Sequence, residues 1–287
     1  MPIDSNSNLY YQAFGPENET SIVFLHGGGA GGWMWRNQVN ALQSEFHCLT
    51  PDLPEQGQSR QAGAYTTEGA ADHIAALIRS QAHGGRAHVV GLSEGAQVVV
   101  ALLSRTPEVV SSAFISSAIL RPMPFASLYT RGVFAWTYRW FLQPFKRNDW
   151  WIRLNMHYSA GIGDEFFPEF KQEFQNTTES GLVNLMTCAL RFRLPDGLQQ
   201  VQTPALVVVG SKEYAQMKES GRDLLKVLSR AQGVMVNLGP KSSLANEHNW
   251  AMSAPERFNE TLRAWIKGET LPGWLLPLET ELSGQKF

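Results

Sequence analysis

The chain has 287 residues, enough for one large domain or for a core domain with an insertion. Its net charge of −2 and charged fraction of 17% give no sign of a nucleic-acid or anionic-membrane partner. No apolar run approaches the roughly 20 residues that span a bilayer, and the polar residues 1–8 lack the pattern of a signal peptide. The two cysteines, Cys48 and Cys188, are far apart and predict free thiols. We therefore expect a cytoplasmic protein.

Strand-like and helix-like segments alternate in the first part of the chain. The apolar run over 21–25 is typical of a strand buried on both faces of a parallel sheet. A helix is predicted over 67–81, where Ala71, Ile74 and Ile78 fall on one stripe. The other predicted elements here are strands over 9–14, 46–50, 87–90 and 109–116 and a helix over 33–44. This alternation favours a doubly wound, mostly parallel sheet, which is an α/β fold.

A segment over 121–195 interrupts the alternation. It is rich in Trp, Phe and Tyr and contains several prolines. Its aromatic runs over 134–141 and 150–152 are too apolar all round for a solvent-facing surface. We therefore expect a helical cap over the carboxyl edge of the sheet, with additional core helices as the alternative interpretation.

Alternation resumes with a second fully apolar strand over 204–210. Residues 1–120 and 196–287 are accordingly expected to form one core domain, with the cap of 121–195 inserted in it. The last predicted elements are a helix over 216–228, a strand over 234–236 and a helix that starts near Pro255.

A glycine-rich loop, His26 to Gly32, follows the first buried strand. Glycines at such a place let the backbone approach a ligand closely and expose its N–H groups. A phosphate loop is one interpretation, but neither Gly-Lys-Ser/Thr nor a G-x-G-x-x-G motif with a suitably spaced acid follows. The loop therefore favours an oxyanion-binding role, with His26 bracing its glycines.

The stretch Gly91-Leu92-Ser93-Glu94-Gly95 joins a strand-like run to a helix-like run. In that context G-x-S-x-G is the motif of a nucleophile elbow, which exposes a serine hydroxyl at the carboxyl end of a strand. The two small residues leave room for the sharp turn, and the N–H of Glu94 faces the same space. A βα turn whose glycines serve only packing is the alternative interpretation.

A serine hydroxyl needs a base to take its proton, and the base needs an acid to orient it and stabilise its charged form. The chain offers Glu213 after the second buried strand and His248 in a later loop. The order serine, acid, histidine is that of the α/β-hydrolase superfamily.

From about residue 21 to residue 265 the chain resembles this superfamily. His26-Gly27-Gly28-Gly29 resembles its oxyanion loop, and residues 52–59 resemble its D-x-P-G-x-G-x-S loop. Glu213 lies at the acid position, and His248, seven residues before a Pro-Glu-Arg-Phe sequence, matches the catalytic histidine. The resemblance implies an α/β-hydrolase fold with an inserted helical cap, a triad of Ser93, His248 and Glu213, and an oxyanion hole from the backbone N–H groups of Gly28 and Glu94.

Three residues depart from the family pattern. Glu213 stands where aspartate is usual, and Glu55 stands where glycine is usual. Glu94 follows the nucleophile at a position where many members carry an apolar residue or glutamine. A negative charge beside a developing oxyanion would oppose catalysis, so the Glu94 carboxylate must point away or be paired, and we expect a solvated or paired side chain.

Together these features predict a serine hydrolase that cleaves a small or medium apolar carboxylic ester through an acyl-enzyme intermediate. No H-E-x-x-H or paired C-x-x-C motif predicts a metal site, and no cofactor is implied. The expected partner is a small-molecule ester, with no nucleic acid and no membrane. A carbon–carbon bond hydrolase, an acyltransferase and a non-catalytic small-molecule receptor stay open as alternatives, and the oligomeric state is not predicted.

Overall fold

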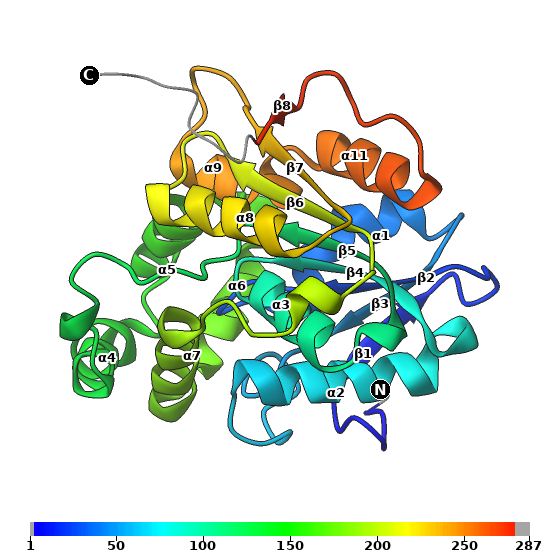
Figure 1. Cartoon of the computed structure of the whole chain (residues 1–287). Helices are drawn as coiled ribbons and strands as arrows, with labels where there is room; N and C mark the ends of the chain where they lie inside the picture. Colours follow the sequence, from blue (N-terminus) through cyan, green and yellow to red (C-terminus); the bar gives the residue numbers. More distant parts are fainter. Residues whose placement is uncertain (1–2, 279–287) are drawn as a thin grey trace, which may run out of the picture.

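The computed structural model describes residues 3–278, apart from the side chain of Ser159. In these residues one sheet runs through the molecule in the order β1-β3-β2-β4-β5-β6-β7-β8. The inner strands pair in parallel, while β1 and β8 pair antiparallel at the two edges. The strands are β1 Tyr11–Phe14, β2 Ser21–Leu25, β3 His47–Pro51, β4 Ala87–Leu92, β5 Val110–Ser116, β6 Ala205–Gly210, β7 Ala231–Val236 and β8 Leu276–Pro277. The predicted doubly wound, mostly parallel sheet is confirmed (Figure 1).

Helices cover both faces of the sheet (Figure 1). Successive side chains of a strand point to opposite faces. Val23 and Leu25 of β2 belong to the core on the face covered by α2, α3 and α8, and Ile22 and Phe24 belong to the core on the face covered by α1 and α11. Burial on both faces explains why β2, β4 and β6 read as continuous apolar runs. The α-helices are α1 Arg36–Leu42, α2 Thr67–Gln81, α3 Glu94–Arg105, α4 Arg131–Thr137, α5 Asp149–Asn155, α6 Phe167–Asn176, α7 Glu179–Arg191, α8 Ala215–Val227, α9 Leu244–His248, α10 Trp250–Ser253 and α11 Pro255–Lys267.

The sequence patterns locate most of these elements to within a few residues. The helix over 67–81 has the predicted bounds because Thr66 caps its start by accepting the N–H of Gly69. The helix predicted over 33–44 instead begins with a 3₁₀ turn, Gly32–Trp35, before α1. The short antiparallel strand β8 was not among the predicted elements, since two residues carry no alternation pattern.

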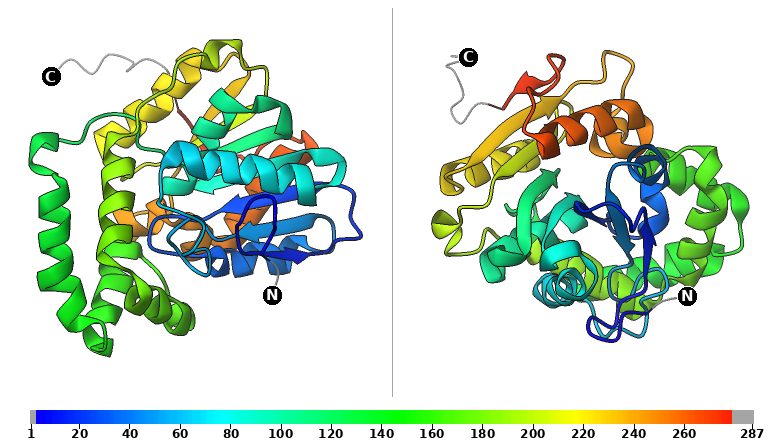
Figure 2. Two further views of the ribbon diagram at one scale, coloured as in Figure 1. Left: turned by 90° about the horizontal axis from the view of Figure 1, so that it is seen from below. Right: turned by 90° about the vertical axis from the view of Figure 1, so that its right-hand side faces the viewer.

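The helices α4 to α7 lie between β5 and β6 in the chain, inside the segment 121–195. They stand beside the core, with α4 on the far side of α7 from the sheet (Figure 1, Figure 2). The expectation that the aromatic runs of this segment avoid solvent is wrong in part: Trp136, Trp140 and Trp150 are 55%, 64% and 68% exposed. Trp136 lies on α4, which packs against α7, Trp140 lies in the π-helical turn Tyr138–Leu142 that follows α4, and Trp150 lies on α5.

Within the described part of the chain, no helix combines the length and apolar character needed to cross a membrane.

Candidate active site

Ser93 lies at the sharp turn between β4 and α3. Its φ of 57° and ψ of −111° place a non-glycine residue in a strained conformation that the surrounding packing must enforce. Two close approaches enforce it: a Cβ on Gly91 would lie 2.4 Å from the Gly95 carbonyl oxygen, and one on Gly95 would lie 2.3 Å from that of Leu25. The backbone N–H of Ser93 also donates to the Ser116 carbonyl at 2.8 Å. The predicted strand–turn–helix elbow is therefore present, with both glycines required by sterics.

A carboxylate and an imidazole meet at the carboxyl ends of the neighbouring strands. Glu213 follows β6, and His248 is the last residue of α9. The distance between Glu213 Oε1 and His248 Nδ1 is 2.6 Å, a short hydrogen bond. The Glu213 side chain is fully buried, and its Oε2 accepts the Gly210 N–H at 2.9 Å. With Nδ1 donating to the carboxylate, His248 keeps Nε2 free to accept a proton.

Ser93 and His248 line the same small cavity, of about 150 Å³, together with Gly27, Gly28 and Met252. No hydrogen bond joins the two side chains among the described residues. Hydrogen bonds of catalytic groups are often long before a substrate is bound and shorten in the complex. The structure thus brings two predicted triad members into contact and sets the third at the same cavity.

The glycine loop after β2 carries N–H groups toward this cavity. Buried His26 braces the loop: its ring donates from Nδ1 to the Gly27 carbonyl at 2.8 Å, and its Nε2 accepts the Leu53 N–H at 2.9 Å. Burial lowers the pKa of His26, which keeps the ring neutral in this role. The N–H of Gly28 has no partner among the described residues, and that of Glu94 lies in the first turn of α3, where helical partners are lacking. Both are available for an oxyanion.

The Glu94 side chain is paired, one of the two arrangements expected for it, and it is buried rather than solvated. It is 3% exposed, and its Oε2 lies only 3.1 Å from the position that a Cβ on Gly28 would take. Its carboxyl oxygens accept the Nε2 of Gln56 at 3.1 and 3.3 Å, and Gln56 Oε1 accepts the Gly29 N–H at 2.8 Å. The carboxyl group is thus paired, and the pairing ties α3 through Gln56 to the glycine loop.

Burial raises the pKa of Glu94 to about 7, against the opposing effect of the nearby Tyr65 hydroxyl and the Gln56 amide. Glu94 can therefore carry its proton near neutral pH. A neutral carboxyl beneath the glycine loop does not repel an oxyanion, whereas an ionised one does.

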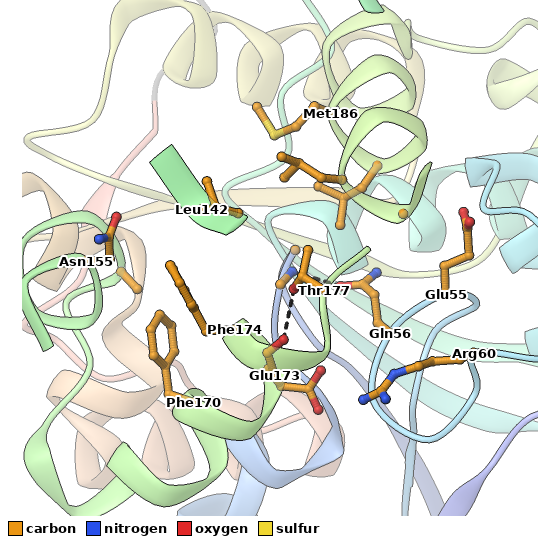
Figure 3. Close-up of a pocket in the computed structure, with 16 residues that line it drawn as sticks. Glu55, Gln56, Arg60, Leu142, Asn155, Phe170, Glu173, Phe174, Thr177 and Met186 are labelled. Carbon is orange, nitrogen blue, oxygen red and sulfur yellow. Dashed lines mark hydrogen bonds between the residues drawn. The ribbon is translucent and has the colours of Figure 1, made fainter. Parts of the chain in front are cut away.

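A larger cavity, of about 490 Å³ and drawn in Figure 3, adjoins the one at Ser93. Both cavities share Gly28, Gly29, Ala160 and Phe170 in their walls. The inserted helices supply most of the apolar wall of the larger one, namely Leu142, Phe170, Phe174, Leu182, Leu185 and Met186. This volume and lining are typical of a small-molecule site.

One side of the larger cavity is polar. Gln56 and Arg60 line it from the core, and Glu173 lines it from α6 (Figure 3). Glu173 Oε2 accepts the Gly57 N–H at 3.1 Å, and burial together with the Asp52 charge raises the pKa of Glu173 to about 7. Sequence reasoning missed these three residues, because their place in the cavity depends on how the inserted helices meet the loop over 52–59.

Glu55, in the same loop, has a left-handed φ of 62°. The conformation explains why glycine is usual at this position of the pattern. The Glu55 carboxylate offsets the strain by accepting the Tyr65 N–H at 2.7 Å and the Asn184 amide at 2.9 Å. Within residues 3–278, no group of His, Cys, Asp and Glu side chains is arranged to hold a metal ion.

The sequence matches the protein family described as alpha/beta hydrolase fold over residues 20–212. It is 26% identical over 272 residues to an AB hydrolase superfamily protein of Gibberella zeae, covering 93% of this chain and 87% of that protein. It is 24% identical over 262 residues to the pimeloyl-[acyl-carrier protein] methyl ester esterase of Neisseria meningitidis, covering 88% of this chain and 96% of that one. A thermophilic esterase from Thermogutta terrifontis has a similar structure, with a TM-score of 0.71 at 21% identity over 91% of this chain and 93% of that one.

Proposed function

Because the chain belongs to the α/β hydrolase fold family, we propose that it is a serine hydrolase that cleaves a small or medium apolar carboxylic ester through an acyl-enzyme intermediate. The observation that carries the proposal is the 2.6 Å hydrogen bond between Glu213 and His248, with His248 and the strained Ser93 lining one cavity. A buried carboxylate behind an imidazole has the geometry that fixes a general base.

In the proposed reaction, Ser93 Oγ attacks the ester carbonyl carbon while His248 Nε2 takes the hydroxyl proton. The carbonyl electrons move to the oxygen, and the N–H groups of Gly28 and Glu94 stabilise that oxyanion. The intermediate then expels the alcohol, which leaves with the proton from His248. A water molecule then attacks the acyl carbon of the acyl-enzyme, with His248 again taking the proton. The bond to Ser93 Oγ breaks, His248 returns the proton to Ser93, and the carboxylic acid is released. Glu213 orients His248 and stabilises its charged form throughout.

The larger cavity supports an apolar substrate. Its side chains from α6 and α7 would exclude water from the ester group, and its volume fits a small or medium acyl or alcohol part. The Neisseria relative is an esterase by name and acts on a methyl ester, and the Thermogutta neighbour is an esterase. We accordingly propose a carboxylic ester over a carbon–carbon bond or an acyl transfer, both of which use the same triad. In this proposal the inserted helices act as a cap.

A fluorophosphonate probe tests the proposal, since it reacts with a serine only when a base activates the hydroxyl. We expect labelling of the wild type and none of Ser93→Ala or His248→Ala. Ser117→Ala is the matched control: Ser117 also has a left-handed φ, of 61°, at the end of the neighbouring strand, but it is buried and does not line the cavity.

The probe also separates the enzyme from a non-catalytic receptor on the same fold. A receptor would bind a small molecule in the larger cavity without an activated serine. Folded wild-type protein that stays unlabelled at neutral pH, or Ser93→Ala that labels as well as the wild type, would contradict the hydrolase. Hydrolysis of a panel of esters that differ in acyl length and leaving group then identifies the preferred class.

A further inference from the structure

Glu247 is a buried acid to which the proposed reaction assigns no part. It precedes His248 in α9, and its side chain is fully buried. It lines neither the cavity at Ser93 nor the larger cavity, so a substrate in either one does not touch it. A buried carboxylate is costly unless hydrogen bonds satisfy it, so the partners of Glu247 show what it holds in place.

The two carboxylate oxygens of Glu247 bind two different loops. Oε2 accepts the Lys212 N–H at 2.8 Å and the Ser211 hydroxyl at 2.9 Å, in the short loop between β6 and the acid of the triad. Oε1 accepts the Leu238 N–H at 3.2 Å and lies 2.8 Å from Ser242 Oγ, in the loop between β7 and α9. Burial raises the pKa of Glu247, but these hydrogen bonds outweigh burial and lower it, so the group is ionised at neutral pH.

The loop that carries Glu213 is tied to both acids. A Cβ on Gly210 would lie 2.9 Å from Glu247 Cβ and 3.1 Å from Glu213 Cγ, so only glycine fits between them. Glu213 Oε2 accepts the Gly210 N–H, while Glu247 binds the two residues that follow. The backbone over 210–212 therefore fixes the position of Glu213 relative to α9.

Lys212 makes the same connection in the opposite direction. Its ammonium group donates to the Gly239 carbonyl at 2.9 Å and to the Ser242 carbonyl, both in the loop before α9. The loop with the acid and the loop that leads to the histidine are thus joined by side chains from each. Glu247 is the buried member of this pair of contacts, and it lies one residue from the catalytic base.

We propose that Glu247 is a positioning residue that sets the hydrogen bond between Glu213 and His248. The inference rests on the proposed serine hydrolase, in which His248 is the base. Successive side chains of a helix point about 100° apart, so Glu247 can hold the loop of the acid while the neighbouring His248 ring meets Glu213. A shift of either loop would lengthen the 2.6 Å bond, and a misplacement of about 1 Å can cost roughly 100-fold in rate.

The geometry requires a carboxylate at this position. Each oxygen of Glu247 faces a backbone N–H, which can only donate. Glutamine has the same shape but carries an NH₂ group in place of one oxygen. In either orientation of the amide, that NH₂ would face the N–H of Lys212 or of Leu238. Glu247→Gln must therefore release one of the two loops.

Steady-state kinetics of the whole protein tests the proposal. We expect Glu247→Gln to lower kcat about 10- to 100-fold and to leave KM within about twofold, because Glu247 does not line either cavity. Asp4→Asn is the matched control. Asp4 is also a buried carboxylate whose oxygens accept two N–H groups, from Ser7 at 2.6 Å and from Gln81 at 2.9 Å, but it lines neither cavity and contacts neither loop. It should keep the wild-type kcat. Far-ultraviolet circular dichroism confirms that each variant is folded.

Proton NMR gives a second readout that a merely structural role would not move. The proton in the short hydrogen bond between His248 Nδ1 and Glu213 should give a far-downfield signal that is absent from His248→Ala. We expect Glu247→Gln to shift this signal upfield or abolish it, and Asp4→Asn to leave it in place. The signal needs no turnover, so it tests the role of Glu247 even if the wild type fails the fluorophosphonate test of the hydrolase.

Four results would overturn the proposal. The first is a folded Glu247→Gln protein with the wild-type kcat or with an unmoved signal. The second is an equal loss of kcat in Asp4→Asn, which would assign the effect to stability. The third is a rise in KM without a fall in kcat, which would place Glu247 at the substrate. The fourth is a folded wild type without the downfield signal.

Ser211→Ala replaces Glu247→Gln in the test if that variant does not fold. It removes one hydrogen bond to Glu247 Oε2 and leaves the carboxylate in place. We expect a fall in kcat of about threefold and a smaller shift of the same signal. An unchanged kcat together with an unmoved signal in Ser211→Ala would overturn the proposal equally.

Discussion

The buried carboxyl of Glu94 predicts a specific dependence of stability on pH. Glu94→Gln replaces it by a neutral group of the same shape that can still accept the Gln56 amide. Burial raises the pKa of Glu94 from 4.5 to about 7, so the folded protein keeps a proton that the unfolded chain releases. Wild-type stability should therefore fall as the pH rises from about 4.5 to about 7 and then level off.

The size of the effect follows from the two pKa values. At 1.36 kcal/mol for each pH unit between them, ionisation of Glu94 costs the folded state about 3 kcal/mol above neutral pH. Glu94→Gln escapes this cost, so we expect the variant to be about 3 kcal/mol more stable than the wild type at about pH 8, and within 1 kcal/mol of it at about pH 5. Glu173 ionises over the same range, but it is present in both proteins and cancels in their difference.

Urea unfolding of both proteins at the two pH values measures this difference. Glu19→Gln, which removes an exposed carboxylate, is the matched control and should show no such change. A difference between Glu94→Gln and the wild type that is the same at both pH values would refute the reasoning. Activity gives a second readout. Ionisation of Glu94 above neutral pH should lower the kcat of the wild type, because the charge lies near the oxyanion, and Glu94→Gln should lack this decline.

Three further predictions concern the same site. Gln56→Ala leaves the Gly29 N–H and the Glu94 carboxyl without their partner, so kcat should fall about 10- to 100-fold with a smaller change in KM, as steady-state kinetics will show. Leu185→Ala enlarges the larger cavity, so the preferred acyl or alcohol chain in an ester panel should lengthen; an unchanged optimum would place the substrate elsewhere. Gly95→Ala sets a Cβ 2.3 Å from the Leu25 carbonyl oxygen and should destabilise the fold by several kcal/mol in urea unfolding, more than the same change at Gly273, where a Cβ would meet no atom within 4 Å.

Local patterns predicted the elements that form the core. The strands β2, β4 and β6 are buried on both faces. Such strands appear in the sequence as short continuous apolar runs, which are easy to recognise. The sharp turn at Ser93 could be predicted because Gly91 and Gly95 enforce its geometry within five residues. The pairing of Glu213 with His248 could be predicted from chain order, since parallel strands bring their carboxyl ends to one edge.

What the sequence did not predict depends on contacts between distant segments. The buried carboxyl of Glu94 accepts the amide of Gln56, which comes from another loop, and no pattern around position 94 predicts that contact. The exposure of Trp136 and Trp140 likewise depends on which side of their helix faces α7. An aromatic run predicts apolar surface, but it does not say whether the partner of that surface lies within the chain.

The covalent intermediate is the most direct measure of the central claim, which is that Ser93 becomes acylated. Wild-type protein mixed with a p-nitrophenyl ester and quenched in acid within milliseconds can be digested and analysed by mass spectrometry. We expect the peptide that contains Ser93 to gain the mass of the acyl group, in an amount that decays as the ester is consumed, and the Ser93→Ala protein to show no gain and no turnover. Rapid hydrolysis with an unmodified Ser93 peptide, or full turnover by Ser93→Ala, would contradict the account.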